Sequence, residues 1–164
     1  MSKATSKSKR KAITVSEWMS KPAIVAEITD TLGRIRRVMA ERRINQLPVV
    51  DEGRLVGIVT DRDIRDAYPT SLVIDRSKEI DSFAETYTVE EVMSHNVIIV
   101  YPSTSLASAV RLLRRHRIGS LPVVKDGRLV GLITRSKILD FVLSGNSLAP
   151  APTAKKKRKK PVKR

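Results

Sequence analysis

The sequence predicts an α/β protein made of two copies of one small unit, each with the element order β-α-β-β-α. The first observation behind this prediction is a gap-free internal repeat, because residues 44–64 and 118–138 are identical at twelve of twenty-one positions with a constant offset of 74. The other two observations are apolar residues at helical spacing and paired apolar runs joined by short turns, found in each copy. A period of 74 residues exceeds the roughly 20–50 residues of solenoid repeats, so it indicates a duplicated domain.

Each copy begins with a short β-branched run, at residues 23–27 and 97–100, which we expect to form a strand. A helix is expected next, because apolar residues then recur three and four positions apart. These apolar residues are Leu32, Ile35, Val38 and Met39 in the first copy and Leu106, Ala109, Val110 and Leu113 in the second.

Two further apolar runs follow in each copy, and the Gly-containing turn between them predicts a β-hairpin. The runs span residues 47–50 and 55–60, and then 121–124 and 129–134. A second helix is expected to begin at Asp61 and at Arg135. Because the runs are apolar at nearly every position, we expect each sheet to be covered on both faces, by its own helices and by the other copy. Packing the copies sheet to sheet would also stabilise units that are marginal at about 60 residues, and it would leave clefts between them.

The composition excludes several classes of protein. Apolar residues make up 41% of the 164 residues and aromatic residues 4%, so the core must consist of Val, Ile and Leu. The sequence has no Cys, which excludes disulfides, a thiolate nucleophile and a Cys-ligated metal. It contains neither an apolar run of about 18 residues nor a secretory signal, so we expect a soluble, cytoplasmic protein. We find no nucleophile elbow, P-loop or dinucleotide fingerprint and therefore expect no enzymatic activity.

The formal charge of +15 is concentrated at the two ends of the chain. Residues 1–12 carry five cations and residues 155–164 carry eight, whereas residues 13–154 carry 19 Lys or Arg against 17 Asp or Glu. We therefore expect the folded body to be nearly neutral. The expected domains are a basic disordered N-terminal tail (1–12), repeat 1 (13–70), a linker with room for a short helix (71–87), repeat 2 (88–146), and a Pro/Ala spacer followed by a polybasic tail (147–164).

The order of the elements, together with LPVVDEGRLVGIVTDRD at residues 47–63, resembles a CBS domain, and the two copies in tandem resemble a Bateman module. The resemblance covers about residues 13–145 and is strongest to small stand-alone CBS-pair proteins of bacteria or archaea. It implies an adenosine-containing ligand such as AMP, ADP, ATP, S-adenosylmethionine or NAD in the clefts between the repeats. It also implies a flat homodimer that reports its ligand state to a partner, with no required cofactor and without the attached catalytic domain, channel or transporter of many members.

The segment from Gly57 to Asp63 matches the signature of this family. In the family the Thr hydroxyl and the Asp carboxylate hold the ribose, which implies this role for Thr60 and Asp63. Phosphate would lie near the start of the following helix, where free N–H groups attract anions and Arg62 could add a charged hydrogen bond. The same spacing also fits a helix capping box, with Thr at the N-cap and an acid three residues later, and the two roles can coexist.

The second copy keeps the Thr of this signature at Thr134 but has Lys137 where the acid would be. Thr134 is then expected to cap a helix, and Lys137 either pairs with phosphate or is a solvated charge. We therefore predict an asymmetric pair with one competent site.

Further candidates surround this signature. Asp30 and Thr104 open the first helices and are secondary ligand candidates, while Ile24 and Ile44, with Val25 and Leu47, line an adenine slot or belong to the core. The positions that are basic in energy-sensing relatives are neutral here, at residues 45–46 and 119–120. This favours AMP, S-adenosylmethionine or another lightly charged adenosine compound over a polyphosphate.

The remaining charged residues carry weaker signals. We expect His95 and His116 to be surface residues, because no acid–His spacing suggests a metal site. The Arg-rich first helices of both repeats predict a solvated face or a surface for an acidic partner or nucleic acid. The C-terminal tail suggests a nucleic-acid contact, a nuclear-import signal, membrane adhesion or a solubilising tail, and its lack of apolar anchors disfavours the membrane. Its cations are Lys155, Lys156, Lys157, Arg158, Lys159, Lys160, Lys163 and Arg164.

Two functions are consistent with these features. The first is a non-enzymatic regulatory module that binds an adenosine-containing ligand between two repeats and signals by conformational change. The alternative is a nucleic-acid-associated protein in which the repeats dimerise the chain and the polybasic tails bind DNA or RNA.

Overall fold

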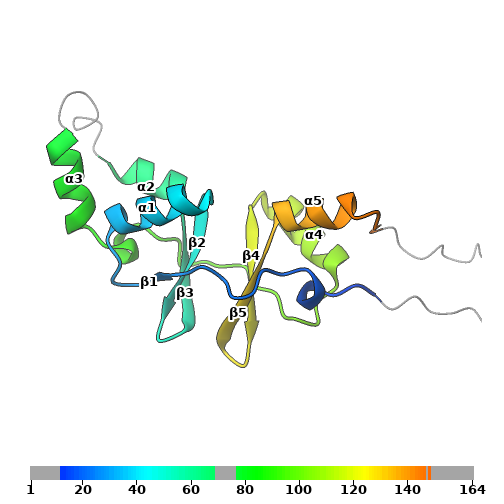
Figure 1. The fold of residues 1–164 in the computed structure, drawn as a ribbon. Coiled ribbons are helices and arrows are strands. Elements are labelled where there is room, and N and C mark those ends of the chain that lie inside the picture. Colours follow the sequence, from blue (N-terminus) through cyan, green and yellow to red (C-terminus); the bar gives the residue numbers. More distant parts are fainter. Residues whose placement is uncertain (1–11, 69–76, 147, 149–164) are drawn as a thin grey trace, which may run out of the picture.

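The computed structural model describes residues 12–68, 77–146 and 148, so the expectations for the two basic tails lie outside the described residues. Two β-hairpins stand side by side in the middle of the molecule, and each repeat carries its helices on the outer side of its hairpin (Figure 1). This arrangement is the predicted pair of units packed sheet to sheet.

The elements follow the predicted order in both repeats. Repeat 1 has β1 (Ala26–Glu27), α1 (Leu32–Arg42), β2 (Gln46–Asp51), β3 (Arg54–Thr60) and α2 (Asp61–Ala67). Repeat 2 has α4 (Leu106–His116), β4 (Ser120–Lys125), β5 (Arg128–Thr134) and α5 (Arg135–Leu143). Repeat 1 begins with the 3-10 helix η1 (Val15–Glu17), and repeat 2 begins with the 3-10 helix η3 (Val89–Glu91). Helix α3 (Ser77–Thr86) lies between the repeats.

The hairpin turns explain why both copies keep a Gly after an acidic residue. Glu52 and Gly53 have φ angles of 48° and 77°, and Asp126 and Gly127 have 51° and 75°. Two consecutive residues with positive φ form a turn whose twist matches that of the flanking strands, and a Gly at the second position adopts it without strain.

The first segment of each repeat crosses over and packs on the other repeat, and these two crossings tie the halves together. Val89 and Met93 belong to the core of repeat 1, whereas Val15 belongs to the core of repeat 2, and Trp18 packs against that core. Backbone hydrogen bonds hold both crossings, from Ile58 N to Ser94 O at 3.0 Å and from Ser20 N to Leu132 O at 2.9 Å.

Two glycines in the central strands make these crossings close. A Cβ at Gly57 would lie 2.4 Å from Met93 Sδ, and a Cβ at Gly131 would lie 2.9 Å from the carbonyl oxygen of Ser20. Residues with a side chain would therefore push the crossing segment away from the sheet.

Two sequence-based expectations need adjustment. Residues 97–100 do not form a strand of their own in the described structure. They follow the crossing segment of repeat 2 and pair with β4 only at Val100, which forms a parallel bridge with Val123. In the linker, α3 is a ten-residue helix that packs on α1, more than the short helix we expected. Its contact is close, since a Cβ at Gly33 would lie 2.5 Å from Glu85 Oε1 and Ala84 is buried.

Candidate functional site

A cleft of about 310 Å³ lies where the end of β3 and the start of α2 meet repeat 2. Repeat 1 provides Thr60 and Asp63 to this cleft, and repeat 2 provides the segment that follows its crossing and the loop between α4 and β4. Its lining comprises Gln46, Ile58, Thr60, Asp63, Ser94, Asn96, Val97, Ile98, Arg117, Ile118, Gly119, Ser120 and Pro122. The cleft is therefore built from both repeats, as the sheet-to-sheet packing predicted.

Thr60 and Asp63 form a reciprocal capping box at the start of α2. Thr60 N and Thr60 Oγ1 both donate to Asp63 Oδ2 at 2.8 Å, and Asp63 N donates to Thr60 Oγ1 at 3.2 Å. The capping role is thus confirmed. All these bonds to the carboxylate use Oδ2, and no donor among the described residues contacts Oδ1. The carboxylate can cap the helix and still accept hydrogen bonds from the cleft.

Ser120 is a second polar residue of the cleft. From the sequence we inferred only that this position carries no charge. Its side chain is 2% exposed, and its Oγ is the one buried side-chain polar atom without a hydrogen-bond partner among the described residues. A buried hydroxyl without a partner costs free energy, and such groups occur where a ligand supplies the missing partner. The donor set of the cleft therefore fits a ligand rich in hydroxyl and ring-nitrogen groups.

Arg117 also lines this cleft, although it belongs to the Arg-rich stretch that we expected to be a solvated face or a partner surface. The residue is exposed and ends α4 in a left-handed conformation, with φ of 55°. Asp63 and Arg117 are the charged members of the lining within the described residues. The counterpart of Arg117 in repeat 1 is Arg43, which also has a positive φ.

The apolar part of the lining comes from residues we did not predict. Ile98 and Ile118 line the cleft, whereas the predicted Ile24 and Ile44 do not. Ile98 and Ile118 follow Ile24 and Ile44 by the repeat offset of 74. The prediction paired Asp63 with apolar residues of its own repeat, but the crossing segments bring those of the other repeat to it. The offset of 74 contained this signal, because the cleft joins Thr60 of repeat 1 to the isoleucines of repeat 2 that correspond to Ile24 and Ile44.

Ile24 and Ile44 occupy other places. Ile24 is 42% exposed, and Ile44 packs against the core of repeat 1. Ile44 also lines an open groove of about 870 Å³ between α1 and α3, which is larger than the cleft. The groove holds exposed charges that already pair, such as Arg37 with Glu85 at 2.9 Å, so it is the weaker candidate for a ligand. Arg62 is exposed on α2 outside the cleft lining.

The equivalent residues of repeat 2 serve the fold. Thr134 caps α5 by accepting from Lys137 N at 3.2 Å. Lys137 Nζ pairs with Asp140 Oδ2 at 3.4 Å along the same helix, with both side chains partly exposed. The predicted asymmetry thus has a structural counterpart: one helix start carries a carboxylate at the cleft and the other carries a cation paired on its own helix.

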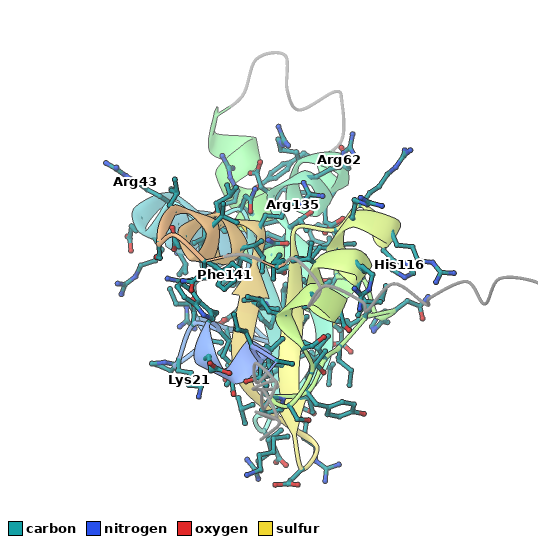
Figure 2. All side chains as sticks on the ribbon, turned by 90° about the vertical axis from the view of Figure 1, so that its right-hand side faces the viewer. Lys21, Arg43, Arg62, His116, Arg135 and Phe141 are labelled. Atoms are coloured by element: carbon teal, nitrogen blue, oxygen red, sulfur yellow. The ribbon has the colours of Figure 1, made fainter. Side chains whose placement is uncertain are left out.

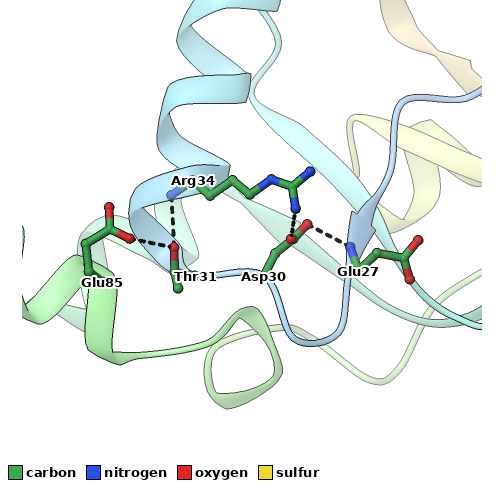
Figure 3. Close-up of polar contacts among 5 residues, drawn as sticks. All are labelled: Glu27, Asp30, Thr31, Arg34 and Glu85. Atoms are coloured by element: carbon green, nitrogen blue, oxygen red, sulfur yellow. Dashed lines mark hydrogen bonds and ion pairs between the residues drawn. The ribbon is translucent and has the colours of Figure 1, made fainter.

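Asp30 and Thr104 hold turns before α1 and α4, and neither lines the cleft. Asp30 is 7% exposed, accepts from Glu27 N at 2.9 Å and pairs with Arg34 (Figure 3). Thr104 Oγ1 accepts from Tyr101 N at 3.0 Å. The N-caps are the next residues along, Thr31 and Ser105. Both candidates therefore satisfy local backbone groups, and their predicted ligand role stays a prediction.

Figure 3 also shows how Glu85 of α3 reaches the start of α1. Its carboxylate accepts from Arg37 Nη1 at 2.9 Å and from Thr31 Oγ1 at 3.1 Å. The hydrogen bond from Arg37, and then that from Thr31, lowers the pKa of Glu85 below its usual value of 4.5. Glu85 thus fastens α3 to α1 as a carboxylate.

Other classes of site are absent from the part of the chain that the structure describes. No group of three His, Cys, Asp or Glu residues there could hold a metal ion. His95 and His116 are both exposed. None of the described helices has the length and apolar character needed to cross a membrane.

The sequence is similar to proteins with known family membership. The CBS domain family matches residues 15–70 and 89–144, together more than half of the chain. A CBS domain-containing protein of Dictyostelium discoideum is 32% identical over 142 residues, covering 85% of this chain and 97% of the relative. Inosine-5'-monophosphate dehydrogenase of Mycobacterium tuberculosis is 41% identical over 116 residues, but the match covers 69% of this chain and 18% of the enzyme. The similarity to the enzyme is therefore restricted to a small part of it.

Solved structures of CBS pairs have the same fold. The CBS-pair protein CBSX2 from Arabidopsis thaliana is 27% identical with a TM-score of 0.69, covering 84% of this chain and all of that one. CBSX2 in complex with AMP matches with 27% identity and a TM-score of 0.65, covering 80% of this chain and 97% of that one. The CBS pair of protein MJ0100, solved with 5-methylthioadenosine and S-adenosylmethionine, matches with 27% identity and a TM-score of 0.66 over 83% of this chain and all of that one. With two family matches in register and this fold, the chain belongs to the CBS domain family as a tandem CBS pair.

Proposed function

We propose that the cleft at the end of β3 binds an adenosine-containing ligand and that the chain acts as a non-enzymatic regulatory module. The observation that carries this proposal is the pairing of Asp63 and Ser120 in one cleft, a carboxylate with a free acceptor atom and a buried hydroxyl without a partner. Structural neighbours crystallised with AMP or with S-adenosylmethionine support the choice of ligand class.

Each part of the ligand has a matching group in the cleft. Asp63 Oδ1 accepts hydrogen bonds from the ribose hydroxyls. Ser120 Oγ donates a hydrogen bond to the ribose or the base, or accepts one from it. Ile98 and Ile118 provide apolar surface for the adenine ring, which gains from leaving water. Arg117 attracts the anionic end of the ligand, a phosphate or a carboxylate.

The size and charge of the cleft narrow the class of ligand. A volume of about 310 Å³ is at the lower end of the usual range for small-molecule sites, about 300–1,000 Å³. It fits one nucleoside better than a dinucleotide. One arginine lines the cleft within the described residues, which favours a single anionic group over a triphosphate. AMP and S-adenosylmethionine satisfy both conditions.

Regulation follows from the composition of the cleft. Because its walls belong to different repeats, a ligand that contacts both stabilises the arrangement of repeats in which those walls are close. The ligand shifts the equilibrium only by its differential affinity for the arrangements. A partner that contacts both repeats would detect this shift.

We also propose that the chain pairs with a second copy through α5. Leu139, Val142 and Leu143 are 62%, 51% and 84% exposed, and their spacing places them on one face of this helix. Exposed apolar residues that cluster in this way are typical of interfaces. In Leu143→Glu the mass measured by light scattering should fall from that of a dimer to that of one chain, and an unchanged mass would exclude this face.

The ligand is identified by calorimetric titration of the purified full chain with AMP, ATP, S-adenosylmethionine and NAD. We expect saturation near one ligand per chain for AMP or S-adenosylmethionine. Asp63→Ala should abolish binding, and Asp63→Asn, whose side-chain oxygen still caps α2, should weaken it about tenfold or more. Ser120→Ala should also weaken binding.

Matched controls separate the site from general stability. Asp66→Asn changes an exposed carboxylate of the same helix that lies outside the cleft and should bind as the wild type does. Lys137→Ala should leave the stoichiometry unchanged. Binding that survives in both Asp63 variants, or heat from none of the four compounds, would refute the assignment of the cleft.

A further inference from the structure

The first helices of the two repeats differ in how their exposed arginines are neutralised. In α1, Arg34 pairs with Asp30 and Arg37 pairs with Glu85 of α3. In α4, Arg111, Arg114 and Arg115 are exposed, and no ion pair among the described residues includes any of them. Arg36 of α1 contacts Tyr68, and Arg42 has no ion pair among the described residues. Two arginines of α1 are thus neutralised by acidic partners, whereas none of these three arginines of α4 is.

The repeat offset shows that this difference involves several positions. Arg111 corresponds to Arg37, but the residue that corresponds to Glu85 is Lys11. In repeat 2, Thr104 replaces Asp30. Arg115 replaces Glu41 as well, whereas Ser108 and Val110 replace Arg34 and Arg36. Repeat 2 has therefore lost the acidic partners of this face and keeps three arginines on it.

The three arginines lie on one side of α4. The buried residues Leu106, Ala109 and Leu113 define the opposite side. Arg111 and Arg115 are four residues apart, so they are neighbours about 6 Å apart along the helix axis. Cations in the last turn are favoured by the helix dipole, but Arg111 lies one turn earlier and gains little from it. Side chains with nitrogen at their tips project outward from α4 beside His116 (Figure 2).

The described chain next to both basic tails is attached to the core that α4 covers. Leu106 N, at the start of α4, donates to Ile13 O at 2.9 Å. Leu148 packs against the same core cluster as Leu106 and Leu113. Ile13, which follows the five cations of residues 1–12, and Leu148, which precedes the eight of residues 155–164, are thus both attached to repeat 2.

We propose that Arg111, Arg114 and Arg115 of α4 form a docking surface for the phosphate backbone of a nucleic acid. Guanidinium groups match phosphate with paired hydrogen bonds. The cations are divided among three separate segments, which suits a long polyanion with a charge about every 1.7 Å of duplex axis better than a local acidic patch of a protein. None of these segments contains an aromatic residue to stack on bases, so the contact is independent of sequence.

The test measures fluorescence anisotropy of a labelled 20-base-pair DNA of random sequence with the full chain over a range of salt concentrations. The variant Arg111→Gln/Arg114→Gln/Arg115→Gln should bind about tenfold or more weakly at low salt. The slope of log K against log salt should become shallower by about 0.9 for each phosphate contact that is lost. A single-stranded DNA and an RNA duplex serve as further probes, and the triple variant should weaken both.

A matched control keeps the total charge equal. The variant Arg42→Gln/Arg54→Gln/Lys125→Gln also removes three exposed cations, none of which lies on α4, and it should bind nearly as the wild type does. Equal weakening by both triple variants would overturn the proposal, because bulk charge would then explain the affinity. Polyglutamate that competes as well as DNA at equal charge would also overturn it, in favour of an acidic protein partner.

Discussion

The two repeats share a backbone but differ in chemistry. Both keep the Gly of the hairpin turn, the Gly where the crossing segment touches the sheet, and the Thr that caps the second helix. Three residues after that Thr they diverge, because Asp63 lines the cleft and Lys137 pairs with Asp140. The residues that the fold requires are therefore shared by both repeats, and the charge that follows the capping Thr is not.

The crossing segments show the same division. Met93 packs on Gly57 in repeat 1 and Met19 packs on Gly131 in repeat 2, with similar geometry. The helices beside them differ, since α3 covers α1 and supplies Glu85, while the segment before Ile13 has only basic charges. Each repeat is thus completed by residues outside its own sequence unit, and the two cannot be expected to fold independently.

The largest effect is expected from Phe141→Ala in repeat 2. Phe141 is fully buried and packs edge to face on Trp18, with the ring centroids 5.1 Å apart. Trp18 comes from the crossing segment at the start of repeat 1. Removal of a buried Phe side chain costs about 3–5 kcal/mol of unfolding free energy. Urea unfolding followed by far-ultraviolet circular dichroism measures this loss.

The fluorescence of Trp18, the one tryptophan, tests whether the repeats unfold together. The matching change in repeat 1 is Ile64→Ala, which also removes a fully buried side chain. Because the crossings tie the repeats together, in each variant the unfolding transition seen by fluorescence should coincide with the one seen by circular dichroism. Separate transitions would show that the repeats are independent domains.

A smaller loss is expected where the glycines meet the crossing segments. In Gly131→Ala the new Cβ lies 2.9 Å from the backbone oxygen of Ser20, which is itself held by hydrogen bonds to Leu132. In Gly57→Ala the closest backbone atom is 3.2 Å away, and the closer Met93 side chain can move. Overpacking of this kind lowers the free energy of unfolding by about 1–3 kcal/mol, and the loss should be larger in Gly131→Ala than in Gly57→Ala.

Gly127→Ala provides the reference for this pair. Nothing lies within 4 Å of its Cβ position, but its φ is 75°, so the cost is left-handed strain of about 1 kcal/mol. Thermal unfolding of the three variants ranks the losses. A Gly57→Ala protein less stable than Gly131→Ala would show that the methionine is rigid and that the crossings are not equivalent.

Much of the fold was predictable because the repeat displays each element twice. The helices at Leu32 and Leu106 and both hairpins follow from patterns that are local in the sequence. The length of α3 was not predictable, because its helix is stabilised by contacts with α1, such as Glu85 with Arg37, that no local pattern contains. The strand expected at residues 97–100 failed for a similar reason, since a crossing determines its direction.

The candidate site was predictable only in part. Thr60 and Asp63 were predicted because they stand in a local signature that resembles that of the CBS family, and the same spacing fits a capping box. Ser120, Arg117 and Ile98 reach the cleft through packing between repeats, and their sequence context does not show which repeat they serve. Cleft residues contributed across a domain interface become visible only when the crossing is known.

The smallest effect is expected at Glu85, the residue that distinguishes the covered helix α1 from α4. Since its pKa is lowered in the folded state, its contribution is present above its ordinary pKa of 4.5 and is lost as the pH falls through the lower folded value. Glu85→Gln removes the charge and keeps an oxygen for Thr31. Backbone hydrogen exchange within α3 should therefore be faster in the variant than in the wild type at pH 6.

A pH series below 4.5 decides whether charge is the cause. As the pH falls through the lowered pKa of Glu85, the wild-type carboxylate takes up a proton, so the difference in exchange between the two proteins should shrink toward zero. Intrinsic rates cancel because both proteins are measured at the same pH. Glu90→Gln changes a nearby exposed carboxyl group and should match the wild type at every pH of the series. A difference that does not shrink across the series would mean that the shape of residue 85, and not its charge, holds α3. The uncovered arginines of α4 would then need an explanation other than the absence of a matching carboxylate.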